Sequence, residues 1–298
     1  MKIGVDIGGM SIKFGVIGDS FEIIEKFSVP TPLESGEALV SVIAETCVGL
    51  KEKYNVDGIG IGTPGIVDDK AGKVVYASNI PFSDTEVVAP VAEKTGLPVR
   101  LGNDANCAML GELYAGYGRE CDNMLMITLG TGVGGGIIID KKPYFGKNGN
   151  AGELGHMCVK MDGEPCGCGR IGCYERYASV STLISLTEKA VADNPGSLLA
   201  EMSKDGVNGK SAFDAMRAGC PVAAAVVDKY IGNVAIGVES FIMIFQPEVI
   251  VFGGAISNEG EYLLAPLREK VSKGVVLACS RLKNDAGLVG AVAQFVGA

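Results

Sequence analysis

Two segments of the chain each consist of an apolar run, a glycine-rich turn and a second apolar run. The first spans residues 2–17 around Gly8-Gly9, and the second spans residues 124–139 around Gly130–Gly136. Apolar runs of strand length joined by glycines predict strand–turn–strand units. Because the second segment resembles the first, we expect a chain with two halves built on one plan.

Helices and strands alternate around these two units, which predicts an α/β fold. The predicted helices span Ser35–Lys53 with Ser35 as N-cap, Glu86–Lys94 ended by Gly96, and Ala105–Ala115, and the predicted strands span Asp57–Gly62, Pro98–Leu101 and Val249–Phe252. Residues 141–175 are rich in Gly and Cys and are expected to be irregular, with helices following to about residue 246. We predict a smaller N-terminal domain at 1–117, joined by a C-terminal helix at about 285–298, and a larger domain at 118–284.

The charge and the apolar pattern of the chain argue against a DNA-binding, secreted or membrane protein. The formal net charge is −9, which argues against a protein that neutralises DNA phosphates. The N-terminus reaches Asp6 without a signal-peptide pattern, and the apolar stretch Ala235–Phe245 is too short to span a bilayer. Nine cysteines in such a chain indicate thiols or metal ligands in a reducing compartment. We therefore predict a cytoplasmic protein that acts on neither nucleic acid nor membrane.

The most specific local motif is the histidine and cysteine set His156, Cys166, Cys168 and Cys173. One imidazole and three thiolates form a common tetrahedral zinc set, and four protein ligands indicate a structural rather than a catalytic ion. His156 is the one histidine of the sequence. A loop of free thiols is the alternative, and Cys158 is a rival ligand that lies further from the cluster.

The glycine turns suit phosphate binding better than dinucleotide binding. Gly130–Gly135 and Gly60–Gly65 both match G-x-G-x-x-G, but neither turn leads into a helix, as the dinucleotide fold requires. Backbone N–H groups in such turns can bind phosphate oxygens, and Asp6 beside the first turn can hold Mg²⁺. A plain Gly-Gly hairpin is the alternative for the first turn.

Three carboxylates are candidates for chemistry or sugar binding. Asp104 follows a predicted strand end, where it could cap the next helix or lie beside an attacking hydroxyl. Glu153 and Glu175 flank the proposed zinc site, and a carboxylate can accept hydrogen bonds from two adjacent hydroxyls. Ordinary solvated surface acids are the alternative for both glutamates.

Together these residues resemble the ROK family (repressors, open reading frames and kinases) of the actin- and hexokinase-like ATPase superfamily. The resemblance covers nearly the whole chain. It rests on Asp6-Ile7-Gly8-Gly9 with Lys13, Gly102-Asn103-Asp104-Ala105-Asn106 with Gly111-Glu112, Leu129 to Gly136, Gly152-Glu153-Leu154-Gly155-His156, Cys166 to Glu175, and Pro247-Glu248 with Gly253-Gly254.

The resemblance implies two actin-like (ribonuclease H-like) α/β domains with the active site in a cleft between them, and an ATP-dependent sugar kinase. It implies that Asp104 is the general base for the sugar hydroxyl. The implied sugar-binding residues are Gly65, Asn79, Asn103, Asp104, Glu153, His156 and Glu175. The implied nucleotide and Mg²⁺ residues are Asp6, Gly8, Gly9, Lys13, Gly130, Thr131, Gly132, Gly253 and Gly254.

Two positions depart from the family pattern. The family usually has Thr after the first Gly-Gly, whereas this chain has Met10, and Ser11 would point to the opposite face of a strand. Many glucose-phosphorylating members carry an aromatic residue near Asn79, a place that Phe82 could take here. The first position bears on turnover and the second on the preferred sugar.

Several functions are compatible with this resemblance. The main prediction is a glucokinase that uses ATP, Mg²⁺ and a structural Zn²⁺. The alternatives are a kinase for N-acetylmannosamine, allose or another sugar, and a non-catalytic sugar-responsive regulator. Repressors of the family carry a helix-turn-helix domain ahead of the first Gly-Gly motif, which begins here at Asp6. By resemblance we also expect a homodimer or a higher homo-oligomer.

Overall fold

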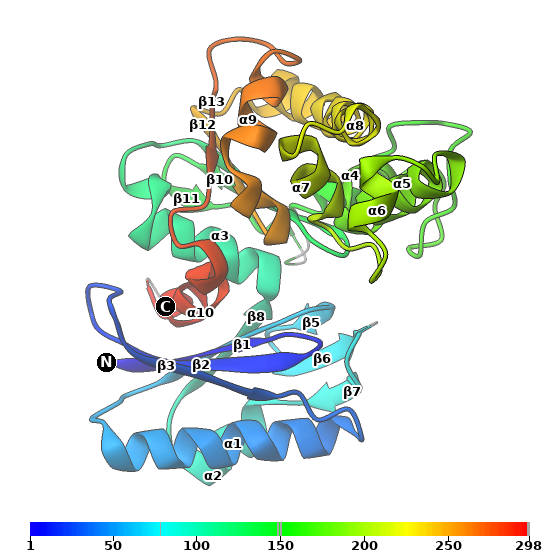
Figure 1. The fold of residues 1–298 in the computed structure, drawn as a ribbon. Coiled ribbons are helices and arrows are strands. Elements are labelled where there is room, and N and C mark those ends of the chain that lie inside the picture. The colour runs from blue at the N-terminus through cyan, green and yellow to red at the C-terminus, as the bar shows by residue number, and fades with distance from the viewer. Residues whose placement is uncertain (78, 148, 150, 297–298) are drawn as a thin grey trace. The chain divides into compact units, whose positions relative to one another are not determined.

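The structure is a computed structural model that describes residues 1–77, 79–147, 149 and 151–296 (Figure 1). Its contacts divide the chain into two compact units. Unit 1 contains Met1–Glu120 and the C-terminal segment from Asp285, and unit 2 contains Cys121–Asn284.

The central sheet of unit 1 has the strand order β3-β2-β1-β4-β8. Its first three strands are antiparallel, and β4 and β8 run parallel to β1. These strands are β1 (Lys2–Ile7), β2 (Ser11–Ile17), β3 (Ile23–Pro30), β4 (Ile59–Thr63) and β8 (Val99–Asn103). A separate three-stranded antiparallel sheet consists of β5 (Ile66–Asp68), β6 (Lys73–Tyr76) and β7 (Ser83–Glu86).

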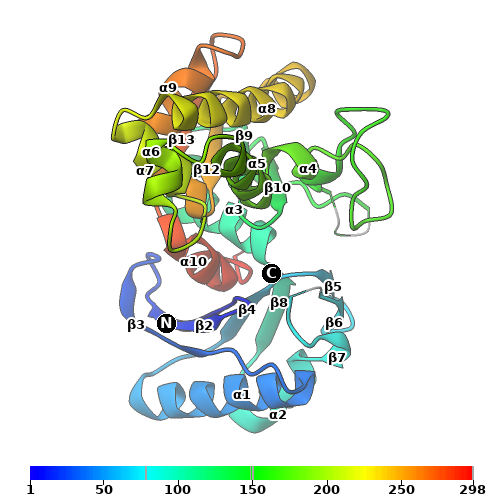
Figure 2. The same cartoon turned by 45° about the vertical axis from the view of Figure 1, so that its right-hand side comes forward.

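Helices cover both faces of the central sheet of unit 1. Figures 1 and 2 show α1 (Gly36–Lys53) and α2 (Val88–Thr95) on one face, and α3 (Asp104–Ala115) and α10 (Ala286–Ala293) on the other. As predicted, the Ser35 side chain caps α1 by accepting a hydrogen bond from Ala38 N. Gly96 ends α2 in the left-handed conformation, where glycine carries no Cβ penalty. The short 3₁₀ helix η1 (Tyr117–Arg119) follows α3.

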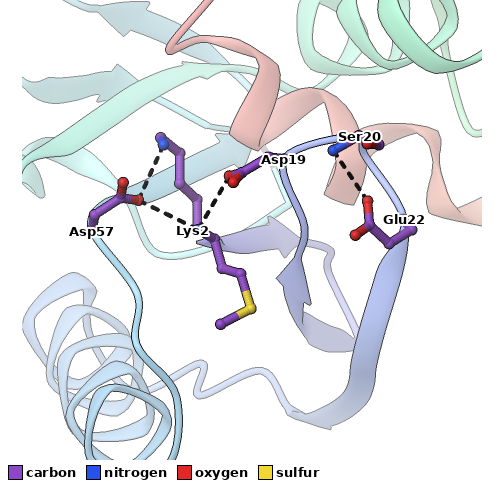
Figure 3. Close-up of polar contacts among 6 residues, drawn as sticks. Lys2, Asp19, Ser20, Glu22 and Asp57 are labelled. Atoms are coloured by element: carbon purple, nitrogen blue, oxygen red, sulfur yellow. Dashed lines mark hydrogen bonds and ion pairs between the residues drawn. The ribbon is translucent and has the colours of Figure 1, made fainter.

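Ion pairs connect the start of β1 to neighbouring loops of unit 1 (Figure 3). Lys2 Nζ lies 3.0 Å from Asp57 Oδ1, and the N-terminal amino group lies 3.2 Å from Asp19 Oδ1. In the same loop Ser20 N donates to Glu22 Oε2 at 3.1 Å. The hydrogen bond from Lys2 lowers the pKa of Asp57. Asp57 is largely exposed, so solvent screening keeps the contribution of this pair to stability small.

The sheet of unit 2 has the strand order β11-β10-β9-β12-β13. Its strands are β9 (Met124–Leu129), β10 (Val133–Ile139), β11 (Lys142–Pro143), β12 (Val249–Gly253) and β13 (Val276–Cys279). The strands β9 to β11 are antiparallel, and β12 and β13 run parallel to β9. This arrangement repeats that of unit 1, so the predicted common plan of the two halves is confirmed.

The core of unit 2 forms where its helices pack against β9 and β12. The helices are α4 (Glu175–Ala178), α5 (Val180–Asp193), α6 (Leu198–Met202), α7 (Ser211–Arg217), α8 (Pro221–Phe245) and α9 (Glu261–Arg268), with the 3₁₀ turns η2 (Leu154–His156), η3 (Ala255–Glu259) and η4 (Lys283–Asp285). Buried residues of β9 and β12, such as Ile127 and Phe252, share one cluster with Val234 and Phe241 of α8.

Helix α8 extends well beyond the apolar stretch Ala235–Phe245 and ends at Phe245, close to the predicted end of the helices near residue 246. The apolar stretch from Ala235 is only its second half, and the whole helix is long and apolar enough to cross a membrane by length and composition alone. Half of the apolar window is buried inside the structure. Tyr230 of this helix donates to Ala178 O at 2.8 Å, and Phe241 meets Tyr174 edge to face at 5.7 Å. The helix therefore supplies a large share of the core of unit 2.

Three local predictions need correction. The turn expected at Gly130–Gly136 is shorter, because β10 already begins at Val133 and pairs with Leu129. The N-cap of α3 is Asn103 rather than Asp104. The C-terminal helix expected at 285–298 is α10, which ends at Ala293; positions 297 and 298 lie outside the described residues.

Candidate functional site

The turn between β9 and β10 exposes two backbone amides of unit 2. Gly130 N donates to Gly132 O at 3.0 Å, which closes the turn. Within the described part of the chain, the N–H groups of Thr131 and Gly132 have no hydrogen-bond acceptor. Two consecutive free amides form a concavity that can bind an anion. The predicted phosphate residues Thr131 and Gly132 therefore have the donors that their role requires, whereas the Gly130 amide is already used.

Gly253 and Gly254 lie against this turn. Gly253 ends β12 and pairs with Thr128 of β9. Gly254 has φ 80°, and a Cβ there would lie 2.3 Å from Leu129 O. Only glycine fits such a close approach of two backbones. The structure thus brings together the two glycine motifs of unit 2 that the resemblance assigned to the nucleotide.

The first glycine turn, in unit 1, has a similar construction. Gly8 N donates to Ser11 O at 3.0 Å, and among the described residues the amides of Gly9 and Met10 have no acceptor. The Met10 side chain is 91% exposed, so it supports no part of the turn. Asn79 lies beside Gly9, since a Cβ on that glycine would be 3.6 Å from Asn79 O.

Asp6 precedes this turn and is held from two sides. Lys13 Nζ lies 2.9 Å from Asp6 Oδ2. On the other side, the first turn of α10 approaches so closely that a Cβ on Gly287 would be 2.9 Å from Asp6 Oδ1. The positive end of a helix stabilises a carboxylate, as does a lysine. These contacts fix the position of the Asp6 carboxylate, which suits an oxygen ligand for Mg²⁺.

The junction of β8 and α3 carries the candidate base. Asn103 Oδ1 accepts hydrogen bonds from Ala105 N at 2.9 Å and Asn106 N at 3.3 Å, which caps α3. Its amide nitrogen donates to Gly65 O at 3.1 Å. Asp104 is the first residue of α3, and one of its oxygens accepts from Ala105 N. Asn103 thus caps α3 and also links the start of this helix to Gly65.

Cys107 is a residue of this region that the sequence did not indicate. It lies on α3 one turn after Asp104 and is fully buried. Burial raises the pKa of its thiol well above the usual value, and the charges of Asp6 and Asp104 raise it further. The charges of Asp6 and Asp104 therefore both act on this buried thiol. The only sequence signal would have been its helical spacing from Asp104.

The predicted zinc ligands gather in unit 2. The ligand atoms of His156, Cys166, Cys168 and Cys173 all lie within 4.8 Å of one another. Cys168 Sγ is 3.6 Å from Cys173 Sγ, and Cys166 Sγ is 3.8 Å from His156 Nδ1. A tetrahedral zinc with Zn–S bonds of about 2.3 Å separates neighbouring sulfurs by about 3.8 Å. The donor set and its spacing therefore fit zinc, and Cys158 is not part of this group.

The thiols of this cluster are in unequal environments. Burial raises the pKa of Cys173 to about 12, whereas a hydrogen bond from the Arg170 backbone lowers that of Cys168. A metal that binds here must displace protons from the thiols, so metal affinity falls as the pH is lowered.

Glu175 connects the cluster with the second glycine turn. Its Oε2 accepts from Val133 N at 2.9 Å, and its Oε1 lies 3.8 Å from Cys166 Sγ. Gly132 leaves room for it, because a Cβ there would be 2.3 Å from Oε2. Glu153 lies on the other side of the histidine, with its Oε2 3.9 Å from His156 Nε2. His156 thus turns Nδ1 toward the sulfurs and Nε2 toward Glu153.

Comparison with known proteins gives the family. The model of the ROK family matches residues 2–296. A glucokinase of Halalkalibacterium halodurans is 36% identical over 97% of this chain and 92% of its own. The crystal structure of a ROK family glucokinase from Streptomyces griseus, in complex with glucose and AMPPNP, is 37% identical and has a TM-score of 0.86 over 97% of each chain. A xylose repressor of Caldicellulosiruptor bescii is 32% identical over 80% of this chain and 62% of its own. The resemblance noted in the sequence is confirmed, and the chain belongs to the ROK family.

Proposed function

We propose that the protein is an ATP-dependent sugar kinase that converts glucose to glucose 6-phosphate. The observation that carries the proposal is the similarity to a glucokinase structure with bound glucose and AMPPNP along 97% of the chain. It is supported by two glycine turns with free amides, one in each unit. We further propose that the two units are the two domains of the kinase.

In this proposal Asp104 is the general base. It accepts the proton of the sugar hydroxyl while the hydroxyl oxygen bonds to the γ-phosphorus and the bond to the β–γ bridging oxygen breaks, which releases ADP. Phosphoryl transfer depends on positioning and charge neutralisation more than on covalent catalysis. The Asn103 cap and the Asn103–Gly65 hydrogen bond hold this end of α3 in place.

Sugar recognition is assigned to amide and carboxylate groups. Asn79, Asn103 and Asp104 with Gly65 would contribute from unit 1, and Glu153, His156 and Glu175 from unit 2. Carboxylates and amides can each satisfy adjacent hydroxyls of a sugar. Because His156 turns Nδ1 toward the cysteines, its Nε2 remains available as a partner for a sugar hydroxyl.

Two metal ions belong to the proposal. Zinc held by His156, Cys166, Cys168 and Cys173 would order the loop that carries His156 and Glu175, without contact to the phosphates. Asp6 would hold Mg²⁺, which neutralises the charge of the nucleotide phosphates when it is bound. Lys13, Gly8, Gly9, Gly130, Thr131, Gly132, Gly253 and Gly254 complete the proposed nucleotide site.

Two alternative functions within the family are possible outcomes of the test described below. The chain could phosphorylate N-acetylmannosamine, allose or another sugar instead of glucose. Phe82, the candidate for the aromatic residue near Asn79, is buried, so its ring is not exposed to a sugar. The relation to a xylose repressor keeps a non-catalytic, sugar-responsive regulator as the second candidate. We place the protein in the cytoplasm as a homodimer or higher homo-oligomer that binds neither nucleic acid nor membrane.

The test is ADP release by zinc-replete protein with ATP and Mg²⁺, across glucose, N-acetylmannosamine, N-acetylglucosamine, allose, mannose and fructose. The proposal predicts the highest kcat/KM on glucose. A higher value on another sugar would retain the kinase and replace its substrate. No ADP release on any of the six, by protein that still binds ATP, would favour the regulator.

A further inference from the structure

The carbonyls of the Gly130–Gly132 turn are bound from outside the turn. Val180 N donates to Gly130 O at 2.8 Å, and Ser181 Oγ donates to Thr131 O at 2.8 Å. Both donors belong to the first turn of α5. A trans peptide plane directs its carbonyl and the following N–H in opposite directions, and none of the described peptide bonds is cis. The amides of Thr131 and Gly132 therefore point away from α5.

The first glycine turn is bound in the same manner. Thr31 Oγ1 donates to Gly8 O at 2.6 Å, and Thr31 N donates to Met10 O at 3.2 Å. Thr31 follows β3 and is buried, so water competes little for its hydroxyl. By the same peptide geometry, the Gly9 amide points away from Thr31.

Three of the four free turn amides follow a carbonyl that is bound in this way, and the fourth, Met10 N, follows the Gly9 carbonyl. Gly9, Thr131 and Gly132 have N–H groups without an acceptor among the described residues. A glycine-rich turn has several accessible backbone conformations, so its peptides can rotate unless a partner holds them. A rotated peptide would present a carbonyl oxygen to a phosphate and would repel it.

We propose that Thr31 and Ser181 are positioning residues for the nucleotide. Each donates a hydroxyl hydrogen bond to one carbonyl of a phosphate turn and so keeps the next amide directed at a phosphate oxygen. Neither residue belongs to a glycine motif, and neither touches the phosphates itself. The inference rests on the proposed kinase function, since it takes the ligand of both turns to be a nucleoside triphosphate with its Mg²⁺.

The test removes each hydroxyl while retaining the shape of the side chain. Thr31→Val and Ser181→Ala are compared with Thr31→Ser and Ser181→Thr, which keep the hydroxyl. Ser240→Ala is the control, because it removes a hydroxyl–carbonyl bond of 2.9 Å within α8. The Kd for Mg²⁺–ADP is measured by calorimetry, together with KM for ATP and for glucose and with Tm.

Loss of one such hydrogen bond is expected to raise the Kd for ADP and the KM for ATP by about tenfold in Thr31→Val and by about threefold in Ser181→Ala, whose hydroxyl is more exposed. KM for glucose should stay at the wild-type value, and the hydroxyl-retaining variants and Ser240→Ala should bind ADP as wild type does. This pattern would support the positioning role.

ADP binding at wild-type strength in both Thr31→Val and Ser181→Ala would overturn the inference. Equal weakening in Thr31→Ser and Ser181→Thr would also overturn it, because the hydroxyl would then not be the cause. A wild-type protein that binds ADP but phosphorylates no sugar would contradict the proposed function alone, and the ADP affinities of the variants would still decide the role of the two hydroxyls.

Discussion

At the scale of single residues, the β8–α3 junction assigns helix capping and the proposed proton transfer to two neighbouring residues. Asn and Asp are about equally good N-caps, and of the pair Asn103-Asp104 only Asp104 was predicted as a possible cap. In the structure Asn103 accepts from both Ala105 N and Asn106 N. Asn103 also donates to Gly65 O. Asn103 therefore provides the helix cap, and proton transfer is the role proposed for Asp104.

Replacing Asn103 should therefore affect both stability and sugar binding. Asn103→Ala removes the cap and the bond to Gly65, and we expect a loss of about 1 kcal/mol of unfolding free energy with a higher KM for glucose. Ser35→Ala is the matched control, since Ser35 caps α1 through Ala38 N at 3.1 Å. Urea unfolding and glucose kinetics distinguish the two. If Ser35→Ala raised KM for glucose as much, the special role of Asn103 would be refuted.

The cysteine loop gives a second prediction at this scale. Cys168→Ser should lose its bound zinc, because a hydroxyl is a far poorer zinc ligand than a thiolate. Cys158→Ser is the control, since Cys158 forms a β-bridge with Cys173 but lies outside the ligand group. Elemental analysis of the purified proteins should give one zinc per chain in wild type and Cys158→Ser and almost none in Cys168→Ser. If Cys158→Ser lost its zinc while Cys168→Ser retained it, Cys158 rather than Cys168 would be the zinc ligand.

At the scale of elements, α3 and α10 pack so closely that glycine is required where they cross. A Cβ on Gly290 would lie 1.5 Å from Cys107 O, and a Cβ on Gly111 would lie 2.4 Å from Ala286 O. These contacts are to backbone atoms, which cannot rotate away as a side chain can. The same close packing brings Gly287 to Asp6, so the C-terminal helix helps to fix the proposed Mg²⁺ ligand.

Gly290→Ala should for this reason destabilise the protein by about 3 kcal/mol or prevent folding, as overpacking of a core does. Gly49→Ala provides the contrast, because Gly49 lies in α1 with nothing within 4 Å of its Cβ position. There the better helix propensity of alanine should stabilise the protein by up to about 1 kcal/mol. Chemical unfolding of both variants tests this, and a Gly290→Ala protein as stable as wild type would contradict the described packing.

The elements that could be predicted from the sequence are those with strong local signals. The Ser35 cap and regular apolar spacing predict α1, and glycines between apolar runs predict both hairpins. The strands β3, β5 to β7, β11 and β13 escaped prediction because they are ordered by pairing with neighbours more than by local preference. The helical position of Cys107 was predictable, but its complete burial depends on how α3 packs.

At the scale of the whole molecule, each of the two units presents a hairpin with free amides at the same place in a common plan. In unit 1 the turn joins β1 and β2, and in unit 2 it joins β9 and β10. The two sheets share their strand order and directions. Sequence comparison of the motifs already indicated this repetition, whereas the hydroxyls that hold the two turns were found only in the structure.

The most direct test of the central claim compares wild type with Asp104→Asn. The account predicts that wild type converts glucose and ATP to glucose 6-phosphate and ADP. It predicts that Asp104→Asn lowers kcat by about 10³-fold, the typical contribution of a general base, while the Kd values for glucose and AMPPNP change little. An Asp104→Asn protein that turned over glucose as wild type does would contradict the assignment of Asp104 as the base.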